Sequence, residues 1–266
     1  MSEVEQSGFA AVAVAPDDGL AVSLSSGSIR SLVVIPAYNE EVALPGVLAE
    51  LEIGVPDFDV LVVVDGATDG TALAARAAGA FVAELPFNLG IGAALRTGFQ
   101  FAARNGYDRV YQFDADGQHD PGQLGQLASA LEDGADMVIG SRFRYGAASY
   151  DVGRVRGRAM GVLRLALQLL SGRRFSDTSS GFRGFAQPAI KYFAASYPAE
   201  YMESVEALLL ACYAGFDVVE VSTTMRDRAG GRPSNRNVKL AYHYCRLLLT
   251  MLTSASLRGR KTERLC

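Results

Sequence analysis

The sequence has few cysteines, and they are scattered along the chain. The 266 residues include three of them: Cys212, Cys245 and Cys266. An odd number of cysteines without the short spacings of a zinc site supports neither a disulfide framework nor a thiolate metal site. This usage is typical of a protein kept in a reducing compartment.

Long apolar runs are also missing. None reaches the ~18 residues that would suggest a membrane-spanning helix. The N-terminus has no basic residue before its Ala/Val stretch and carries several acidic residues, which makes it a poor signal peptide. Residues 1–28 are rich in small residues without a sustained period, so we predict a flexible leader that carries no chemistry.

Charge is unevenly distributed behind a modest net value of −4. The stretch from Arg142 to Arg174 holds eight arginines and a single acid, and the stretch from Arg226 to the C-terminus holds ten lysines and arginines against two acids. Such segregation indicates that the later parts of the chain meet something anionic, either phosphates or a membrane surface. The alternative is that these charges lie on solvated helix faces.

Short apolar, β-branched runs alternate with helical patterns through the first half of the chain. This alternation is typical of an α/β fold with a single, mostly parallel central sheet and helices on both faces. Such strands are buried on both sides and are therefore apolar throughout. The predicted strands are 31–35, 60–64, 80–84, 109–113 and 136–139.

The strand predicted at 109–113 ends in two carboxylates separated by one residue. Alternate side chains of an extended segment point to the same side, so Asp114 and Asp116 can face one point, and Gln118 can follow them. Carboxylate and amide oxygens suit Mg²⁺ or Mn²⁺, and Mg²⁺ of this kind usually also binds a substrate phosphate. The alternative is a polar turn in which Asp120 and Pro121 open the next helix.

Other predicted strand ends carry polar groups as well. In open α/β sheets ligands bind beyond the carboxyl ends of the strands, which is where Pro36 to Glu40 and Asp65 lie. Asp65 is placed to accept hydrogen bonds from a nucleobase or ribose, whereas Asn39 and Asp69 are predicted to cap helices. The glycine-rich stretch 88–98 could let a ligand approach a helix start, although it is neither a P-loop nor a dinucleotide fingerprint.

The regular alternation breaks at Arg142. An arginine-rich helix is predicted from about Val155 to Leu170, then a polar turn at 176–183, a helix at 203–214 and a strand at 217–221. The tail at 238–257 has the pattern of a basic amphipathic helix, which could lie in a membrane interface or pack on the domain.

These segments together resemble the family 2 glycosyltransferases of the GT-A fold, over roughly residues 32–234. The last strings are most similar to the branch that makes polyprenyl (dolichyl) phosphate sugars. Two departures stand out: the Arg228–Ser234 string is one residue longer than in that branch and is followed by Asn235 in place of a common lysine, and Val64 stands where an aspartate is frequent. The matching strings, in order, are Val34–Glu41, Val63–Thr71, Asn88–Gly98, Asp114–Gln118, Gly140–Arg142 and Asp177–Arg183.

The resemblance implies a role for each matching residue. The cation, Mg²⁺ or Mn²⁺, would be bound by Asp114, Asp116 and Gln118, and Arg142 and Arg183 would face the diphosphate or the acceptor phosphate. Asp177 is the first candidate for a catalytic base, ahead of Glu200 and Glu203. The residues expected to bind the nucleotide sugar are Pro36, Ala37, Tyr38, Glu40, Asp65, Gly92, Arg96, Asp114, Ala115 and Arg228.

The implied function is a metal-dependent, inverting transfer of a sugar from a nucleotide-diphosphate sugar to a polyprenyl phosphate. The first alternative replaces that acceptor with a hydroxyl of a glycan or lipid-linked saccharide, and the second is a nucleotide-sugar-binding module without turnover. A nucleotidyltransferase fits less well, because the basic phosphate loop expected near the first strand is absent.

The predicted organisation is a leader at 1–28, a glycosyltransferase domain at 29–235 and a basic amphipathic tail at 236–266. The expected location is the cytoplasm, in peripheral contact with the cytoplasmic face of the membrane. No nucleic-acid partner is expected, and a homo-oligomer is left open.

Overall fold

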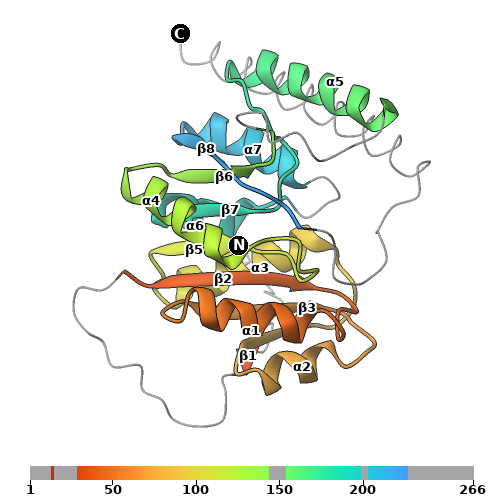
Figure 1. Cartoon of the computed structure of the whole chain (residues 1–266). Coiled ribbons are helices and arrows are strands. Elements are labelled where there is room, and N and C mark those ends of the chain that lie inside the picture. The colour runs from red at the N-terminus through yellow and green to blue at the C-terminus, as the bar shows by residue number, and fades with distance from the viewer. Residues whose placement is uncertain (1–12, 15–28, 144–153, 199–202, 227–266) are drawn as a thin grey trace, which may run out of the picture.

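The computed structural model describes residues 13–14, 29–143, 154–198 and 203–226. They form one sheet with the strand order β1-β4-β3-β2-β5-β7-β6-β8 (Figure 1). The strands, in chain order, are β1 (Ala13–Val14), β2 (Ser31–Ala37), β3 (Asp59–Asp65), β4 (Phe81–Leu85), β5 (Arg109–Gln112), β6 (Met137–Ser141), β7 (Arg183–Ala186) and β8 (Val218–Ser222).

The sheet is mostly parallel, as the sequence predicts. β2 pairs in parallel with β3 and β5, β3 with β4, and β6 with β8. β7 is antiparallel to both of its neighbours, β5 and β6, so β5 and β6 run in the same direction. The predicted strands are confirmed, although β2 and β3 extend to Ala37 and Asp65 and thereby carry the chain directly into the candidate site.

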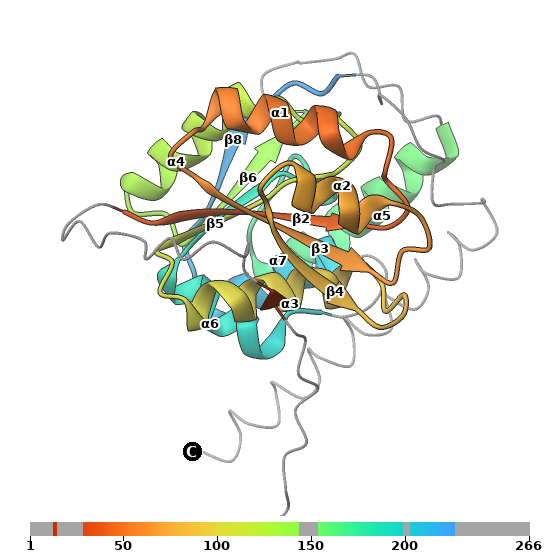
Figure 2. The ribbon, with the colours of Figure 1, turned by 90° about the horizontal axis from the view of Figure 1, so that it is seen from below.

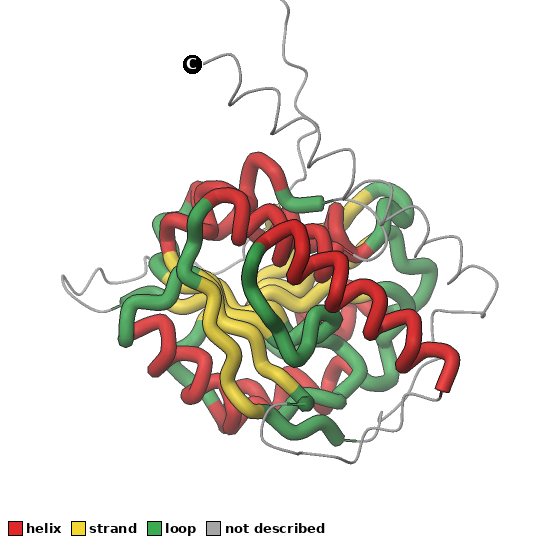
Figure 3. Tube along the Cα trace, turned by 90° about the horizontal axis from the view of Figure 1, so that it is seen from above, coloured by secondary structure: helices red, strands yellow, loops and turns green. Residues whose placement is uncertain are grey.

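Helices cover both faces of the sheet (Figures 2 and 3). One face packs against α1 (Leu44–Gly54) and α4 (Leu124–Glu132), and the other against α3 (Ile91–Arg104), α6 (Gln187–Ser196) and α7 (Glu203–Ala214). The sheet residues alternate between the two cores, so that Val33 and Ile35 face α1 while Leu32 and Val34 face α3. All four are at most 1% exposed, which explains the unbroken apolar run.

The remaining helices are peripheral. α2 (Thr71–Ala77) lies beside β3 and β4, and a 3₁₀ turn, η1 (Pro121–Gln123), precedes α4. α5 (Arg154–Ser171) lies beyond the β6–β8 end of the sheet, where it packs against α7 (Figures 1 and 3). Within the described ranges, no helix is long and apolar enough to cross a membrane.

The structure differs from two local predictions, the capping role of Asn39 and the flexible leader. Asn39 does not cap α1, which begins at Leu44; instead it adopts a positive φ of 55° and its Oδ1 accepts the Thr68 amide at 2.9 Å. Within the predicted leader, β1 pairs antiparallel with β4. The amphipathic tail at 238–257 and the Arg228–Ser234 string lie outside the described residues.

Candidate active site

The candidate site lies at the carboxyl edge of the sheet. Because β2, β3, β5 and β6 run in the same direction, the segments that follow them emerge at this edge. β7 runs the opposite way, so its first residue, Arg183, also lies there. The topology thus gathers the ends predicted from sequence: Ala37–Glu40, Asp65, Asp114–Gln118, Arg142 and Arg183.

Side-chain hydrogen bonds connect the loops after β2 and β3. The Glu40 amide donates to Thr71 Oγ1 at 2.9 Å, and Glu41 Oε2 accepts the Gly70 amide at 2.7 Å. The N-cap of α2 is Gly70 and not Asp69 as predicted, although Asp69 Oδ1 accepts the amide of the first helical residue, Thr71, at 3.0 Å. Beside these loops Ala37 is buried while Tyr38 is 48% exposed, so the Tyr38 ring is open to a ligand.

Asp65 fixes the loop that opens α3. Its two carboxylate oxygens accept the Leu89 and Gly90 amides at 2.7 and 2.8 Å, and the side chain is 4% exposed. Gly92 is buried in the first turn of α3, where helix amides lack intrahelical partners. Asp65 therefore orders the neighbouring loop, in addition to any hydrogen bond that it makes to a nucleoside.

Arg96 points away from this loop. Its Nη2 donates to the Ala195 carbonyl at 2.8 Å, at the end of α6. The prediction that Arg96 binds the nucleotide sugar is therefore not supported by the geometry, which ties α3 to α6 through this side chain.

Gly66 cannot be replaced without disturbing the same loop. Its φ is +63°, and a Cβ at this position would lie 2.3 Å from the backbone of Phe87 and Asn88. A left-handed conformation alone costs a residue with a Cβ about 1–2 kcal/mol. We expect Gly66→Ala to lower the free energy of unfolding by clearly more than that, measured by urea titration.

Gly79 offers a matched control. Its φ is +76°, and nothing lies within 4 Å of the Cβ that alanine would add. Gly79→Ala should therefore show the conformational cost alone. Equal losses in the two variants would contradict the proposed backbone clash.

The acidic turn after β5 is largely buried. Asp116 is 5% exposed, and its Oδ1 accepts the Gln118 amide at 3.0 Å. Asp114 Oδ2 lies 2.9 Å from His119 Nε2, and the His119 ring stacks on Phe182 with centroids 4.9 Å apart. The structure thus makes His119 a hydrogen-bonding partner of Asp114.

The segment after β8 is hydrogen-bonded to the acidic turn. The Arg226 amide donates to the Gln118 carbonyl at 2.9 Å, and Gln118 Nε2 donates to the Arg226 carbonyl at 3.4 Å. The Arg226 guanidinium contacts Glu50 and Asp120 at 2.6 and 3.1 Å. In the sequence, Arg226 was notable only as the first residue of the basic C-terminal stretch.

The acidic turn contains two carboxylates that could bind a cation, those of Asp114 and Asp116. Among the described residues, no group of three or more His, Cys, Asp or Glu could hold a metal ion. Mg²⁺ is usually held by only one or two carboxylates together with substrate phosphates. The donor set of Asp114 and Asp116 therefore fits a cation that arrives with a diphosphate, and it does not fit a resident structural metal.

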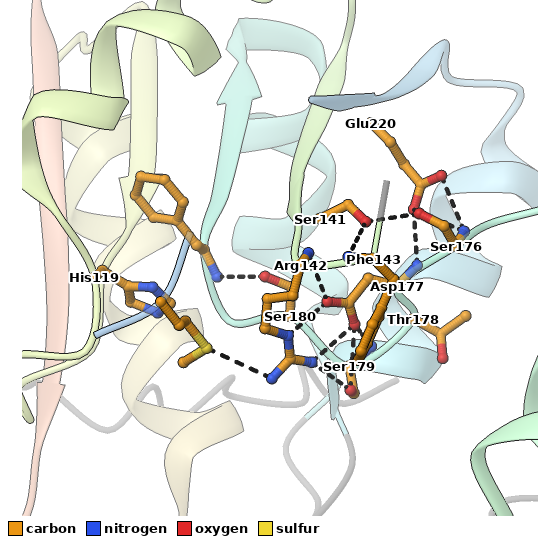
Figure 4. A network of polar contacts seen from close by, with 12 residues as sticks. His119, Ser141, Arg142, Phe143, Ser176, Asp177, Thr178, Ser179, Ser180 and Glu220 are labelled. Atoms are coloured by element: carbon orange, nitrogen blue, oxygen red, sulfur yellow. Dashed lines mark hydrogen bonds and ion pairs between the residues drawn. The ribbon is translucent and has the colours of Figure 1, made fainter. Parts of the chain in front are cut away.

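Arg142 and Asp177 form a bidentate pair at the end of β6 (Figure 4). Arg142 Nε donates to Asp177 Oδ2 at 2.6 Å and Nη2 to Oδ1 at 2.9 Å. Ser179 adds two contacts, since its Oγ accepts from Arg142 Nη2 at 2.8 Å and its amide donates to Asp177 Oδ1 at 3.1 Å. The Arg142 guanidinium is thereby fixed in one plane at the rim of the site.

The Asp177 carboxylate is fully buried, at 0% exposure. Burial by itself would raise its pKa, but the hydrogen bonds and charge of Arg142 outweigh this and hold the pKa of Asp177 below its ordinary value. A carboxylate with both oxygens engaged and a lowered pKa is a weak base. Asp177 as a catalytic base stays a prediction, and the geometry favours a positioning role.

A second carboxylate supports the turn that carries Asp177. Glu220, on β8, accepts the amides of Ser176 and Asp177 at 2.9 Å each (Figure 4). Glu220 reaches this turn because β8 pairs with β6, and no local sequence pattern around Glu220 predicts that pairing.

Arg183 and Glu203 are both buried in the structure. Arg183 was expected to face a phosphate, but it is 0% exposed and its Nε donates to the Ser180 carbonyl at 2.8 Å. Glu203 is 6% exposed, and burial raises its pKa. Glu200 and Arg228 lie outside the described residues.

Comparisons with known proteins point in one direction. A family model described as Glycosyl transferase family 2 matches residues 32–193. Polyprenol monophosphomannose synthase from Mycolicibacterium smegmatis is 33% identical over 228 residues, covering 80% of this chain and 84% of that protein. Undecaprenyl-phosphate mannosyltransferase from Micrococcus luteus is 34% identical over 168 residues, covering 61% and 69%.

A solved structure shares the fold. Glucosyl-3-phosphoglycerate synthase from Mycobacterium tuberculosis, in complex with Mn²⁺, uridine diphosphate and glucosyl-3-phosphoglycerate, superposes with a TM-score of 0.65. The match covers 86% of this chain and 80% of that one at 22% sequence identity, so it concerns the arrangement of the backbone.

Proposed function

The chain belongs to glycosyl transferase family 2 and has the GT-A fold, and from that premise we propose that it transfers a sugar from a nucleoside diphosphate to a polyprenyl phosphate. Use of a nucleotide sugar follows from the family and its relatives. The observation that carries the choice of acceptor is the fixed Arg142 guanidinium, which shares one sheet edge with the acidic turn at Asp114–Gln118.

The nucleoside would lie over the loops after β2 and β3. Pro36 and Ala37 end β2 there and Tyr38 follows them, and Asp65 ends β3. The exposed Tyr38 ring offers an aromatic surface to a base, and Asp65 holds the Gly90 loop beside it. The diphosphate would then extend toward Asp114, Ala115 and Asp116.

The cation would be Mg²⁺ or Mn²⁺, bound by Asp114 and Asp116 with Gln118 beside them. When bound, it would act as a Lewis acid on the departing diphosphate. Its support here is the donor set of two carboxylates, together with the Mn²⁺ present in the structurally similar synthase. The chain's own part is to hold the two carboxylates, through His119 for Asp114 and through the Gln118 amide for Asp116.

A phosphate acceptor agrees with the state of Asp177. A hydroxyl must lose its proton during transfer and needs a base within hydrogen-bond reach, whereas a phosphate is already an anion. The Nε and Nη2 groups of Arg142 donate to both oxygens of Asp177, so this carboxylate is a weak base for a hydroxyl acceptor. The acceptor oxygen would bond to the anomeric carbon as the bond to the diphosphate breaks, with inversion in this single displacement.

The relatives suggest where this happens. The polyprenol monophosphomannose synthase and the undecaprenyl-phosphate mannosyltransferase are both named for long-chain polyprenyl lipids, and such lipids lie in membranes. We propose that the reaction takes place at the cytoplasmic face of the membrane, because the sequence concentrates Lys and Arg in the stretch from Arg142 to Arg174 and in the C-terminal stretch, and such basic stretches are attracted to anionic lipid.

A transfer assay tests the proposal. Purified protein is incubated with GDP-mannose, UDP-glucose or UDP-N-acetylglucosamine, polyprenyl phosphate and Mg²⁺ or Mn²⁺, and lipid products are identified by mass spectrometry. We expect a polyprenyl-phosphate sugar from one donor, loss of product with a chelator, and no product from the matched polyprenol that lacks the phosphate.

Other outcomes would contradict this. Transfer to the polyprenol or to a glycan hydroxyl would favour the alternative acceptor. Metal-dependent binding of a nucleotide sugar without any product would favour a binding module.

A further inference from the structure

Three buried side chains near the candidate site carry polar atoms without partners. Within the described ranges, Gln112 Nε2 and Oε1, Arg183 Nη1 and Tyr197 Oη make no hydrogen bond. The residues are 1%, 0% and 2% exposed. Buried polar groups are nearly always satisfied, so a cluster of exceptions calls for a polar partner that the chain itself does not supply.

Two of these residues are direct neighbours in the sheet. Gln112 of β5 and Arg183 of β7 are Cα partners in the antiparallel register. Val110 and Phe185 are also Cα partners, two residues further along each strand, and they face α3 and α6. Because alternate residues of a strand face the same side of the sheet, Gln112 and Arg183 face α3 and α6 as well. They form the last row of this ladder, two residues before Asp114.

Tyr197 and Glu203 flank this row from the helices. Tyr197 follows α6, and its ring packs on Phe99 and Phe193 with centroids 5.1 and 5.3 Å apart. Glu203 begins α7 and accepts a hydrogen bond from Ser204 Oγ at 2.7 Å.

Electrostatic coupling ties these residues to one another and to the acidic turn. Burial raises the pKa of Tyr197, and the negative charges of Glu203 and Asp114 raise it further. Burial lowers the pKa of Arg183, while the charge of Glu203 opposes that shift. Within the described ranges, Arg183 donates hydrogen bonds to the Ser180 and Thr178 carbonyls at 2.8 and 3.4 Å, while its Nη1 atom has no partner.

We infer that Gln112, Arg183, Tyr197 and Glu203 form the subsite that binds the hydroxyl groups of the donor sugar. This inference rests on the proposed function. It adds Gln112 and Tyr197, to which neither the motifs nor the comparisons assign a role, and it gives Arg183 and Glu203 a different role from those that the sequence predicted. The subsite lies beside Asp114, where the diphosphate would end and the sugar begin.

The chemistry of the four groups selects a neutral polyol. A guanidinium only donates hydrogen bonds, a carboxylate only accepts them, and a carboxamide and a phenol do both. Neighbouring sugar hydroxyls, each a donor and an acceptor, can satisfy all four. An apolar lipid chain, by contrast, would leave every group unsatisfied.

Tyr197→Phe is the sharpest test because it removes only the unpaired hydroxyl. Affinities for GDP, UDP, GDP-mannose and UDP-glucose would be measured by isothermal titration calorimetry with Mg²⁺ present. We expect the nucleotide sugar to bind about 2- to 10-fold more weakly, the range for one neutral hydrogen bond, while the free nucleotide binds as before. The melting temperature should not fall, since no hydrogen bond of the free protein is lost.

Tyr107→Phe is the matched control. Tyr107 Oη donates to Asp59 Oδ2 at 2.7 Å, and Asp59 begins β3 at the opposite edge of the sheet. This variant should lower the melting temperature and leave all four affinities unchanged.

Gln112→Met is a second, independent variant of similar volume that removes both amide atoms. It should also weaken binding of the nucleotide sugar and spare the free nucleotide. Unchanged sugar affinity in both Tyr197→Phe and Gln112→Met would overturn the subsite and assign these groups to buried water. If the wild type binds none of the four ligands, the proposed function fails first, and the subsite fails with it.

Discussion

Asp116→Asn is expected to lower kcat for sugar transfer by about 10²- to 10³-fold, the typical cost of removing a group that stabilises transition-state charge. Asparagine keeps the shape and the oxygen that accepts the Gln118 amide, so the turn after β5 should persist. What is lost is a negative charge on a side chain that is 5% exposed. The decrease in kcat should be measured at a saturating concentration of the nucleotide sugar. The Mg²⁺ concentration that gives the half-maximal rate should rise.

Asp120→Asn is the control for this prediction. Asp120 belongs to the same turn, but its Oδ1 accepts the Gly122 amide at 3.0 Å and contacts Arg226 Nη2 at 3.1 Å. Exposed ion pairs of this kind contribute about 0–1 kcal/mol, so kcat should change only slightly. If Asp116→Asn kept its rate while Asp120→Asn lost it, the site of the cation would have to be moved.

The parallel half of the sheet could be predicted because its cause is local. A strand that is buried on both faces must be apolar throughout, and Val60–Val64 meets that condition without reference to the rest of the chain. The same reasoning locates Asp65 and Asp114, because residues that follow parallel strands meet at one edge whatever the details of packing.

β7 could not be predicted in this way. Its four residues, Arg183 to Ala186, include a charged residue and a glycine and show no apolar run. They form a strand because β5 and β6 both offer unpaired edges to them, which is a property of the assembled sheet. The sequence therefore indicated a polar turn up to Arg183 and missed the strand that begins there.

The roles of individual side chains were harder to predict than their positions. Asp177 and Arg142 are 35 residues apart, and no periodicity reveals that they pair. The resemblance implied that Arg183 faces a phosphate, and arginine is almost never fully buried. The structure buries it beside Gln112, a contact that exists only because β7 pairs with β5.

Asp177→Asn is expected to reduce both stability and transfer rate, because it removes one partner of a largely buried ion pair. Such removals typically cost about 3–5 kcal/mol in the free energy of unfolding. The lowered pKa of Asp177 means that its contribution to stability is present above its unfolded value of 3.8 and is lost as the pH falls through the still lower folded value. Urea titrations should show wild-type stability falling in this acidic range more steeply than that of the variant.

A double-mutant cycle with Arg142→Met separates a positioning role of Asp177 from a catalytic one. If Asp177 acts by holding the Arg142 guanidinium at 2.6 and 2.9 Å, then Asp177 has nothing to position once Arg142 is gone. The kcat of the double variant should then equal that of Arg142→Met alone, and the two single losses should not multiply. A base that acts on the acceptor would lower kcat whether or not Arg142 is present, so multiplied losses would restore Asp177 as the base and favour a hydroxyl acceptor over a phosphate.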